Sequence, residues 1–193
     1  MTPDIHSHSL RQALSRAEIS PAPENPSFKK ACVFLLLFGE DAPRALFIQK
    51  ADTAGYPWRN QVALPGGHVE KKDTSPLHTA YRELYEETGI LQDHVEFLFS
   101  LGHFQTIRSV DIEALVGWWN EKDEVRFDSR EISRVLKIPL ATLLEAHAEK
   151  GFSGNDPGVE DLVYPLGPVK DAVIWGATAR IVHFFIEAIR PFC

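Results

Sequence analysis

The chain has 193 residues, of which 44% are hydrophobic and 24% are charged, and its net charge is −7. This size suits one globular domain, and the apolar content excludes a chain that is disordered throughout. The negative charge argues against a protein that holds nucleic acid by its backbone. No apolar run reaches the roughly 18 residues needed to span a bilayer. We therefore expect a cytoplasmic protein with neither a nucleic acid nor a membrane as partner.

The N-terminal residues 1–28 are expected to form an appendage to one domain at 29–193. Within this appendage, residues 9–17 place Leu10, Ala13, Leu14 and Ala17 on one side of a short helix. Several prolines between residues 19 and 27 cannot continue a helix and predict an extended linker.

From residue 30 onward the sequence alternates between strand-like and helix-like patterns. The predicted strands are 31–38, 44–50, 62–64, 95–104, 110–119 and 132–138. The predicted helices are 76–88, 139–148 and 175–189. Ser75 is the expected N-cap of the first of these helices, and Gly89 is expected to end it. This order predicts an α+β fold, an α/β/α sandwich with a mixed β-sheet between helices.

The segment that carries chemistry is a Pro-Gly-Gly turn at 65–67 and the helix that follows it. On this helix Glu83, Glu86 and Glu87 are spaced i, i+3 and i+4, so their carboxylates converge. Such like charges destabilise a helix by a few tenths of a kcal/mol, and Arg82 alone cannot neutralise three of them. An isolated Glu-rich face is usually solvated surface. Beside a glycine turn, however, it favours a site for Mg²⁺ or Mn²⁺, which carboxylates and substrate phosphates commonly bind together.

Residues 67–90 resemble the signature of the Nudix hydrolase family, Gx5Ex7REUxEExGU, in which U is aliphatic. The matching residues are Gly67, Arg82, Glu83, Leu84, Glu86, Glu87, Gly89 and Ile90. The acidic position after the glycine is Asp73 rather than Glu, and eight residues instead of seven separate it from Arg82. In both departures the chain resembles the signature of the subgroup that hydrolyses coenzyme A and its thioesters.

Other segments resemble the same subgroup, so the resemblance covers roughly residues 30–190. They are 49–67, 131–140 and 173–179. The loop at 56–60 and the pair Glu113-Ala114 differ from the subgroup. This keeps open a Nudix pyrophosphatase for ADP-ribose, a nucleotide sugar or a dinucleoside polyphosphate. A non-catalytic nucleotide-binding domain is a further alternative.

The resemblance implies a Nudix fold with a catalytic loop-helix-loop, and metal-dependent hydrolysis of a pyrophosphate linkage. The substrate is then a small nucleoside diphosphate derivative, coenzyme A above others, and the cofactor is Mg²⁺ or Mn²⁺. Glu83, Glu86 and Glu87 are the expected metal ligands, and Gly66 adds its carbonyl oxygen.

The expected catalytic residues are Glu86, which also positions water, Arg82, which orients a neighbouring carboxylate, and Glu131, which is favoured as general base. Glu113 is the alternative general base. The residues expected to contact substrate are Gly67, Arg59 and Lys50. The strongly apolar final helix leaves a homodimer open.

Overall fold

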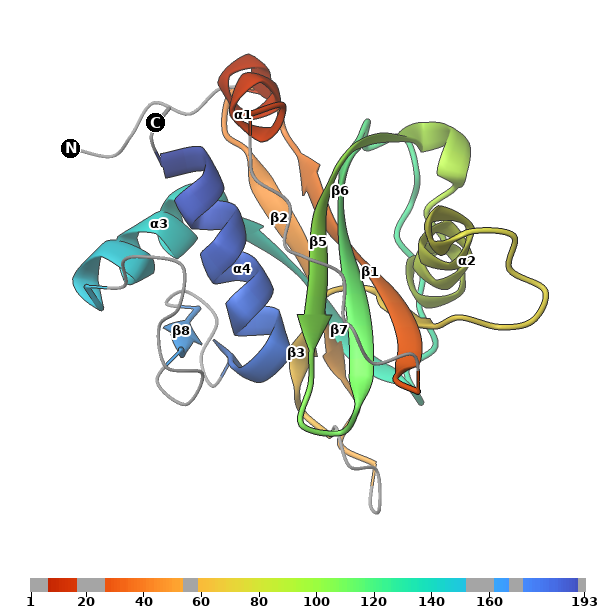
Figure 1. Cartoon of the computed structure of the whole chain (residues 1–193). Coiled ribbons are helices and arrows are strands. Elements are labelled where there is room, and N and C mark those ends of the chain that lie inside the picture. The colour runs from red at the N-terminus through yellow and green to blue at the C-terminus, as the bar shows by residue number, and fades with distance from the viewer. Residues whose placement is uncertain (1–6, 17–26, 54–58, 152–161, 167–171, 191–193) are drawn as a thin grey trace.

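A three-layer arrangement organises the molecule, as a computed structural model of the chain shows. The structure describes residues 7–16, 27–53, 59–151, 162–166 and 172–190. In Figure 1, α2 (Pro76–Thr88) covers one face of a central sheet. The helices on the other face are α1 (Ser7–Leu14), α3 (Leu140–Glu149) and α4 (Gly176–Ile189). The predicted α+β sandwich is confirmed.

The central sheet is mixed and has seven strands. They are β1 (Lys29–Phe38), β2 (Arg44–Lys50), β3 (Val62–Ala63), β4 (Gly66–His68), β5 (Val95–Gln105), β6 (Val110–Trp119) and β7 (Ile132–Pro139). The main path runs β3-β2-β1-β6-β5, while β4 pairs with β1 and β7 pairs with β2. Only the β1–β6 pair is parallel among the described pairs of this sheet.

Four short elements are absent from the sequence prediction. They are β4, the 3₁₀ helix η1 (Gln92–His94), and β8 (Tyr164–Pro165) and β9 (Val173–Ile174), which form a separate small sheet. These elements have three residues or fewer, which is too short for a hydrophobic period to be recognised. All predicted strands and helices are present, and α2 has the predicted ends.

The continuous apolar run in β1 is buried on both faces of the sheet. Phe34, Leu36 and Phe38 pack with Leu84 of α2, while Leu35 and Leu37 pack in the larger core under α1, α3 and α4. A strand covered on both faces needs apolar side chains at successive positions rather than at alternate ones. This explains why the run carries no polar alternation.

Local signals determine where α2 begins and ends. The Ser75 hydroxyl accepts a hydrogen bond from the His78 backbone N–H at 3.1 Å, which confirms the predicted N-cap. Gly89 has a φ of 74°, and its N–H donates to the Tyr85 carbonyl at 2.8 Å. The helix that carries the glutamates is therefore fixed in register at both ends.

The first and last helices share one core. Leu10, Ala13 and Leu14 of α1 are buried in the same cluster as Phe185 and Ile189 of α4. The apolar character of α4 is thus explained by packing within one chain, and a homodimer stays a prediction. No helix in the described part of the chain is long and apolar enough to cross a membrane.

A buried polar network joins α3, α4 and β8. His147 is 2% exposed, and its ring nitrogens lie 2.9 Å from the Tyr164 hydroxyl and 2.9 Å from the Glu187 carboxylate. Burial lowers the pKa of His147 because it disfavours the charged imidazolium, although the bond to Glu187 opposes this shift.

This network predicts a loss of stability in acid. An unfolded chain, in which His147 has a pKa of about 6.5, binds more protons than the folded chain as the pH falls through that value. The free energy of unfolding should therefore fall between pH 7.5 and pH 5.5, and fall less in His147→Gln. Denaturant unfolding at both pH values measures this difference. His8→Gln, on the exposed side of α1, is the control, and an equal pH-dependent loss in all three proteins would contradict the prediction.

Candidate active site

Glu87 is the most deeply buried of the three glutamates on α2. Its side chain is 7% exposed, and its Oε1 lies 2.5 Å from Lys50 Nζ at the end of β2. Its Oε2 accepts a hydrogen bond of 2.8 Å from the Gly66 backbone N–H. Burial raises the pKa of Glu87, and the Lys50 ammonium and the Gly66 N–H oppose that rise.

Arg82 gathers the remaining carboxylates. Its guanidinium donates to Glu83 Oε1 at 2.8 Å, to Glu86 Oε2 at 3.0 Å and to both oxygens of Asp73 at 3.0 and 2.9 Å. It also donates to the carbonyl oxygen of His68 at 3.1 Å. The Arg82 side chain is only 10% exposed, so it is held in a fixed orientation between loop and helix.

Asp73 is the anchor of this arrangement. Its side chain is fully buried and also accepts bonds of 2.9 Å from the Thr79 hydroxyl and 2.9 Å from the Glu70 backbone N–H. The hydrogen bonds from Arg82 hold the pKa of Asp73 well below its usual range. Asp73 therefore stays ionised and locks Arg82 against the helix.

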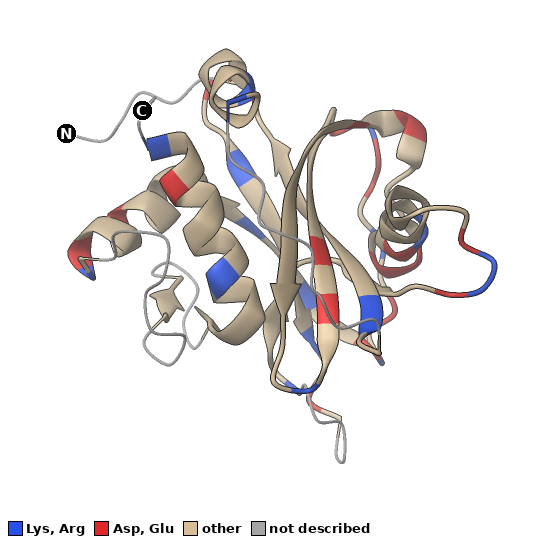
Figure 2. Ribbon diagram, viewed as in Figure 1, with Lys and Arg blue, Asp and Glu red and all other residues tan. Residues whose placement is uncertain are grey.

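Two glycines allow β4 to approach both α2 and β1. A Cβ at Gly67 would overlap the carboxylate of Glu83, and a Cβ at Gly66 would overlap the backbone of Cys32 and Val33. Gly66 also has a φ of 148°, which side-chain-bearing residues rarely adopt. The turn thus brings backbone atoms against the carboxylates. Acidic and basic positions lie close together around α2 and the loop before it (Figure 2).

The donor types at this site suit a hard divalent cation. Carboxylate and backbone carbonyl oxygens are the ligands that such ions prefer. Among the described residues, however, no three His, Cys, Asp or Glu side chains are gathered closely enough to hold a metal ion as they stand. Arg82 and Lys50 supply the positive charge that the carboxylates need here.

Comparison with known proteins identifies the family. The family model for the NUDIX domain matches residues 28–162. The chain belongs to the NUDIX domain family. It is a Nudix pyrophosphohydrolase, as the resemblance predicts, and it acts on a diphosphate linkage in a nucleotide derivative. Nudix hydrolases generally use divalent metal cations.

Relatives in sequence and structure agree with this assignment. The uncharacterized Nudix hydrolase NudL of Photorhabdus laumondii is 25% identical over 175 residues, covering 90% of this chain and 92% of the relative. The protein of the same description from Yersinia enterocolitica is 26% identical over 185 residues, covering 94% and 93%.

Two crystal structures share the fold. A MutT/nudix family protein from Enterococcus faecalis superposes with a TM-score of 0.58 and 18% identity, covering 98% of this chain and 76% of that one. A MutT protein from Methanosarcina mazei Go1 gives a TM-score of 0.54 and 18% identity, covering 88% and 98%. At this identity the likeness supports the Nudix fold alone.

The structure brings together most residues of the predicted Nudix site. Glu83 and Glu86 share Arg82, while Gly66 and Lys50 both contact Glu87. The Gly66 contact runs through its N–H, whereas the sequence prediction concerns its carbonyl.

Other candidate residues lie around this cluster. Arg59 is exposed, and its Nε lies 4.0 Å from the Asp52 carboxylate, at the loop end beside Lys50. The structure does not bring Arg59 among the carboxylates of α2. Residues 54–58, which include Tyr56 and Trp58 of the 56–60 loop, lie outside the described residues.

Both candidate general bases of the Nudix enzyme lie on strands or turns next to the site. Glu131 is exposed at the start of β7, and its carbonyl accepts the Ala51 N–H at 2.9 Å. Glu113 lies on β6 opposite Cys32, which in turn pairs with Gly67, and its Oε1 accepts the Ser100 hydroxyl at 3.0 Å. The choice between them stays a prediction.

Asp73 as the main partner of Arg82 is the functional contact that sequence reasoning missed. The i, i+4 spacing predicts the bond to Glu86, which is confirmed. Helical periodicity does not relate Asp73, which lies in the loop, to Arg82, which lies in the second turn of α2. The only signal for Asp73 in the sequence was the acidic position of the family signature.

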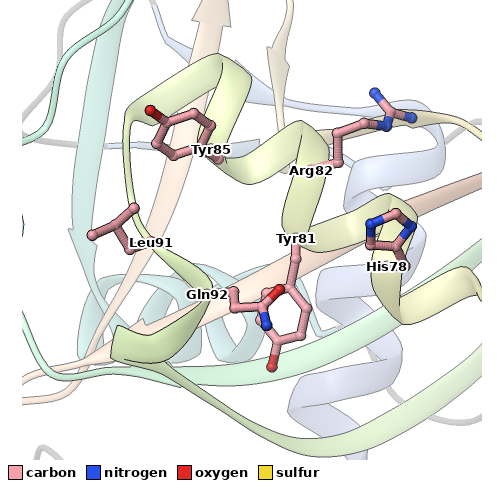
Figure 3. Close-up of a pocket in the computed structure, with 6 residues that line it drawn as sticks. All are labelled: His78, Tyr81, Arg82, Tyr85, Leu91 and Gln92. Atoms are coloured by element: carbon pink, nitrogen blue, oxygen red, sulfur yellow. The ribbon is translucent and has the colours of Figure 1, made fainter.

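An open hollow lies on the outer side of α2. It has a volume of about 260 Å³ and is lined by His78, Tyr81, Arg82, Tyr85, Leu91 and Gln92. Figure 3 shows the Arg82 guanidinium pointing away from Tyr81 and Leu91. The hollow is therefore separate from the carboxylate cluster, although Arg82 borders both.

Alanine substitutions at Gly67 and Gly66 should differ in their effect on the melting temperature. The three atoms nearest to a Cβ at Gly67 all belong to the Glu83 carboxylate, which can move away, so the melting temperature of Gly67→Ala should change little. Because Glu83 is displaced, the metal-dependent hydrolysis rate should fall by about 100-fold.

In Gly66→Ala the new Cβ would instead overlap the backbone of Cys32 and Val33, and residue 66 itself has a positive φ. This substitution should therefore lower the melting temperature strongly. Thermal unfolding and a hydrolysis assay on both variants check this contrast. An active Gly67→Ala protein, or a Gly66→Ala protein of unchanged stability, would contradict the geometry.

Proposed function

We propose that this Nudix hydrolase cleaves the diphosphate of coenzyme A or its thioesters, releasing 3′,5′-ADP and (acyl-)4′-phosphopantetheine. The observation that carries the proposal is the pair of hydrogen bonds between Arg82 and Asp73. The short aspartate and the extra residue after it are the two departures that resemble the coenzyme A subgroup. In this chain the side chain of that aspartate is fully buried and accepts two hydrogen bonds from Arg82. This contact supports a role for the aspartate in the site.

Glu83, Glu86 and Glu87 are the proposed ligands of Mg²⁺ or Mn²⁺, with the Gly66 carbonyl as a further ligand. When bound, such an ion neutralises diphosphate oxygens and lowers the pKa of a water molecule. The protein contributes orientation, since Arg82 holds Glu83 and Glu86 side by side and the Gly66 N–H holds Glu87. Pre-positioned carboxylates need little reorganisation when substrate binds.

The proposed reaction is attack of water on phosphorus with departure of the opposite phosphate oxygen. Glu131 is the proposed general base, which takes a proton from the attacking water, and Glu86 orients that water. Arg59 and Lys50 are proposed to meet the negative charge of the substrate. Gly67 is proposed to meet the substrate through its backbone, since the Glu83 carboxylate fills the space that a Cβ would take.

A second candidate substrate class is ADP-ribose, a nucleotide sugar or a dinucleoside polyphosphate. The observation that favours it is Glu113, whose carboxylate is bound to Ser100. The coenzyme A subgroup usually has Thr-Pro where this chain has Glu113-Ala114. A carboxylate there changes the charge next to the site, and substrate selection depends on such contacts.

Removing the charge of one glutamate should abolish most activity without unfolding the protein. Glu86→Gln and Glu87→Gln keep the size and shape of the side chain but remove its charge and one acceptor oxygen, so we expect kcat to fall by about 100-fold or more. Glu145→Gln, on the exposed side of α3 in the other layer, is the matched control. Equal turnover by the site variants and the parent would remove these carboxylates from the mechanism.

A substrate panel tests the choice of substrate. With Mg²⁺ or Mn²⁺ present, kcat/KM for coenzyme A should exceed that for ADP-ribose, a nucleotide sugar and a dinucleoside polyphosphate by about 10-fold or more. Chromatography of the products should show 3′,5′-ADP and 4′-phosphopantetheine. Faster turnover of any other substrate would replace coenzyme A in the proposal and leave the Nudix chemistry intact.

A further inference from the structure

Each glutamate on α2 already has a positively charged partner from the chain, but the two partners differ in kind. Arg82 serves Glu83 and Glu86 and is also locked by Asp73. Lys50 serves Glu87 from the last position of β2, and its side chain is 17% exposed. A lysine is a compact point charge on a flexible stem, whereas the forked guanidinium is rigid. The charged end of Lys50 can therefore reorient more readily than the guanidinium of Arg82.

The two oxygens of Glu87 have different partners. Oε2 accepts the Gly66 N–H at 2.8 Å, a contact that belongs to the β4 turn. Oε1 lies 2.5 Å from Lys50 Nζ. Oε1 is the oxygen at which a cation can bind Glu87 without competing with the Gly66 N–H. The cation then meets the ammonium of Lys50, and two positive charges a few ångströms apart in a poorly solvated site repel each other.

We propose that Lys50 is the resident counter-cation of Glu87, and that it yields Oε1 to the divalent cation and turns to phosphate oxygens of the substrate. This rests on the proposed role of Glu87 as a metal ligand. A buried carboxylate with no positive partner is strongly destabilising. When no cation is bound, Lys50 supplies that positive charge to Glu87. With the cation bound, the displaced ammonium gains most by meeting a phosphate. Metal binding and substrate binding are thereby coupled through one side chain.

The test compares Lys50→Met, which keeps length but removes charge, with Lys50→Arg, which keeps charge. The dissociation constant of Mn²⁺ is measured without substrate by electron paramagnetic resonance of the free ion. Without its competitor, Lys50→Met should bind Mn²⁺ on the order of 10-fold more tightly than the parent. The metal-free form of Lys50→Met should melt at a lower temperature than the metal-free parent. Mn²⁺ should raise the melting temperature of Lys50→Met by more than it raises that of the parent.

Lys50→Arg keeps the charge, so its metal-free form should melt close to the parent and it should gain no Mn²⁺ affinity. Lys122→Met, at an exposed loop position, is the control. Unchanged or weaker Mn²⁺ binding by Lys50→Met would overturn the inference and leave Lys50 as a substrate contact only. If Lys50→Met does not fold without metal, native circular dichroism should return when it is refolded with Mn²⁺. Failure of Mn²⁺ to restore it would also overturn the inference.

Glu87→Gln separates this inference from the proposed function. If Glu87→Gln binds Mn²⁺ as tightly as the parent, the metal site itself is misassigned. If Glu87→Gln loses Mn²⁺ affinity while Lys50→Met gains none, only the role of Lys50 fails. Neither result depends on which nucleotide the enzyme hydrolyses.

Discussion

Electrostatic repulsion among carboxylates is the constraint on which this site is built. Three glutamates lie within five residues of α2, and Asp73 is buried beside them. Such a group is stable only when positive charge is brought to it. Arg82 and Lys50 bring that charge from the helix itself and from the end of β2. The arrangement holds the carboxylates in a fixed orientation, which favours binding of a divalent cation.

The sheet supplies the rigidity that holds these charges in place. β1 is buried on both faces, and it pairs with β4 along Ala31, Cys32 and Val33. Because β4 contains Gly66 and Gly67, this pairing carries backbone groups to the carboxylates of α2. Leu84, at the centre of α2, is fully buried against the same strand layer. Core packing and the geometry of the site are thus determined by the same few contacts.

The sequence predicts those parts of the structure that local chemistry controls. The ends of α2 follow from Ser75 and Gly89, and the convergence of the glutamates follows from helical spacing alone. The sequence does not predict β4, because a glycine pair has no hydrophobic period and its strand character arises from pairing with β1. The Lys50–Glu87 contact joins residues 37 positions apart and depends on how β2 meets α2. For the same reason the sequence does not choose between Glu113 and Glu131 as general base, since the distance of each from α2 depends on how the strands pair.

The most direct measurement of the central claim is a crystal structure with Mn²⁺, located by its anomalous scattering. The account predicts a manganese ion within about 2.5 Å of carboxylate oxygens of Glu83 and Glu87. Lys50 should then have left Glu87 Oε1 while Arg82 still binds Asp73. A crystal with saturating Mn²⁺ and no ion between these carboxylates, or an ion bound elsewhere in the fold, would contradict it.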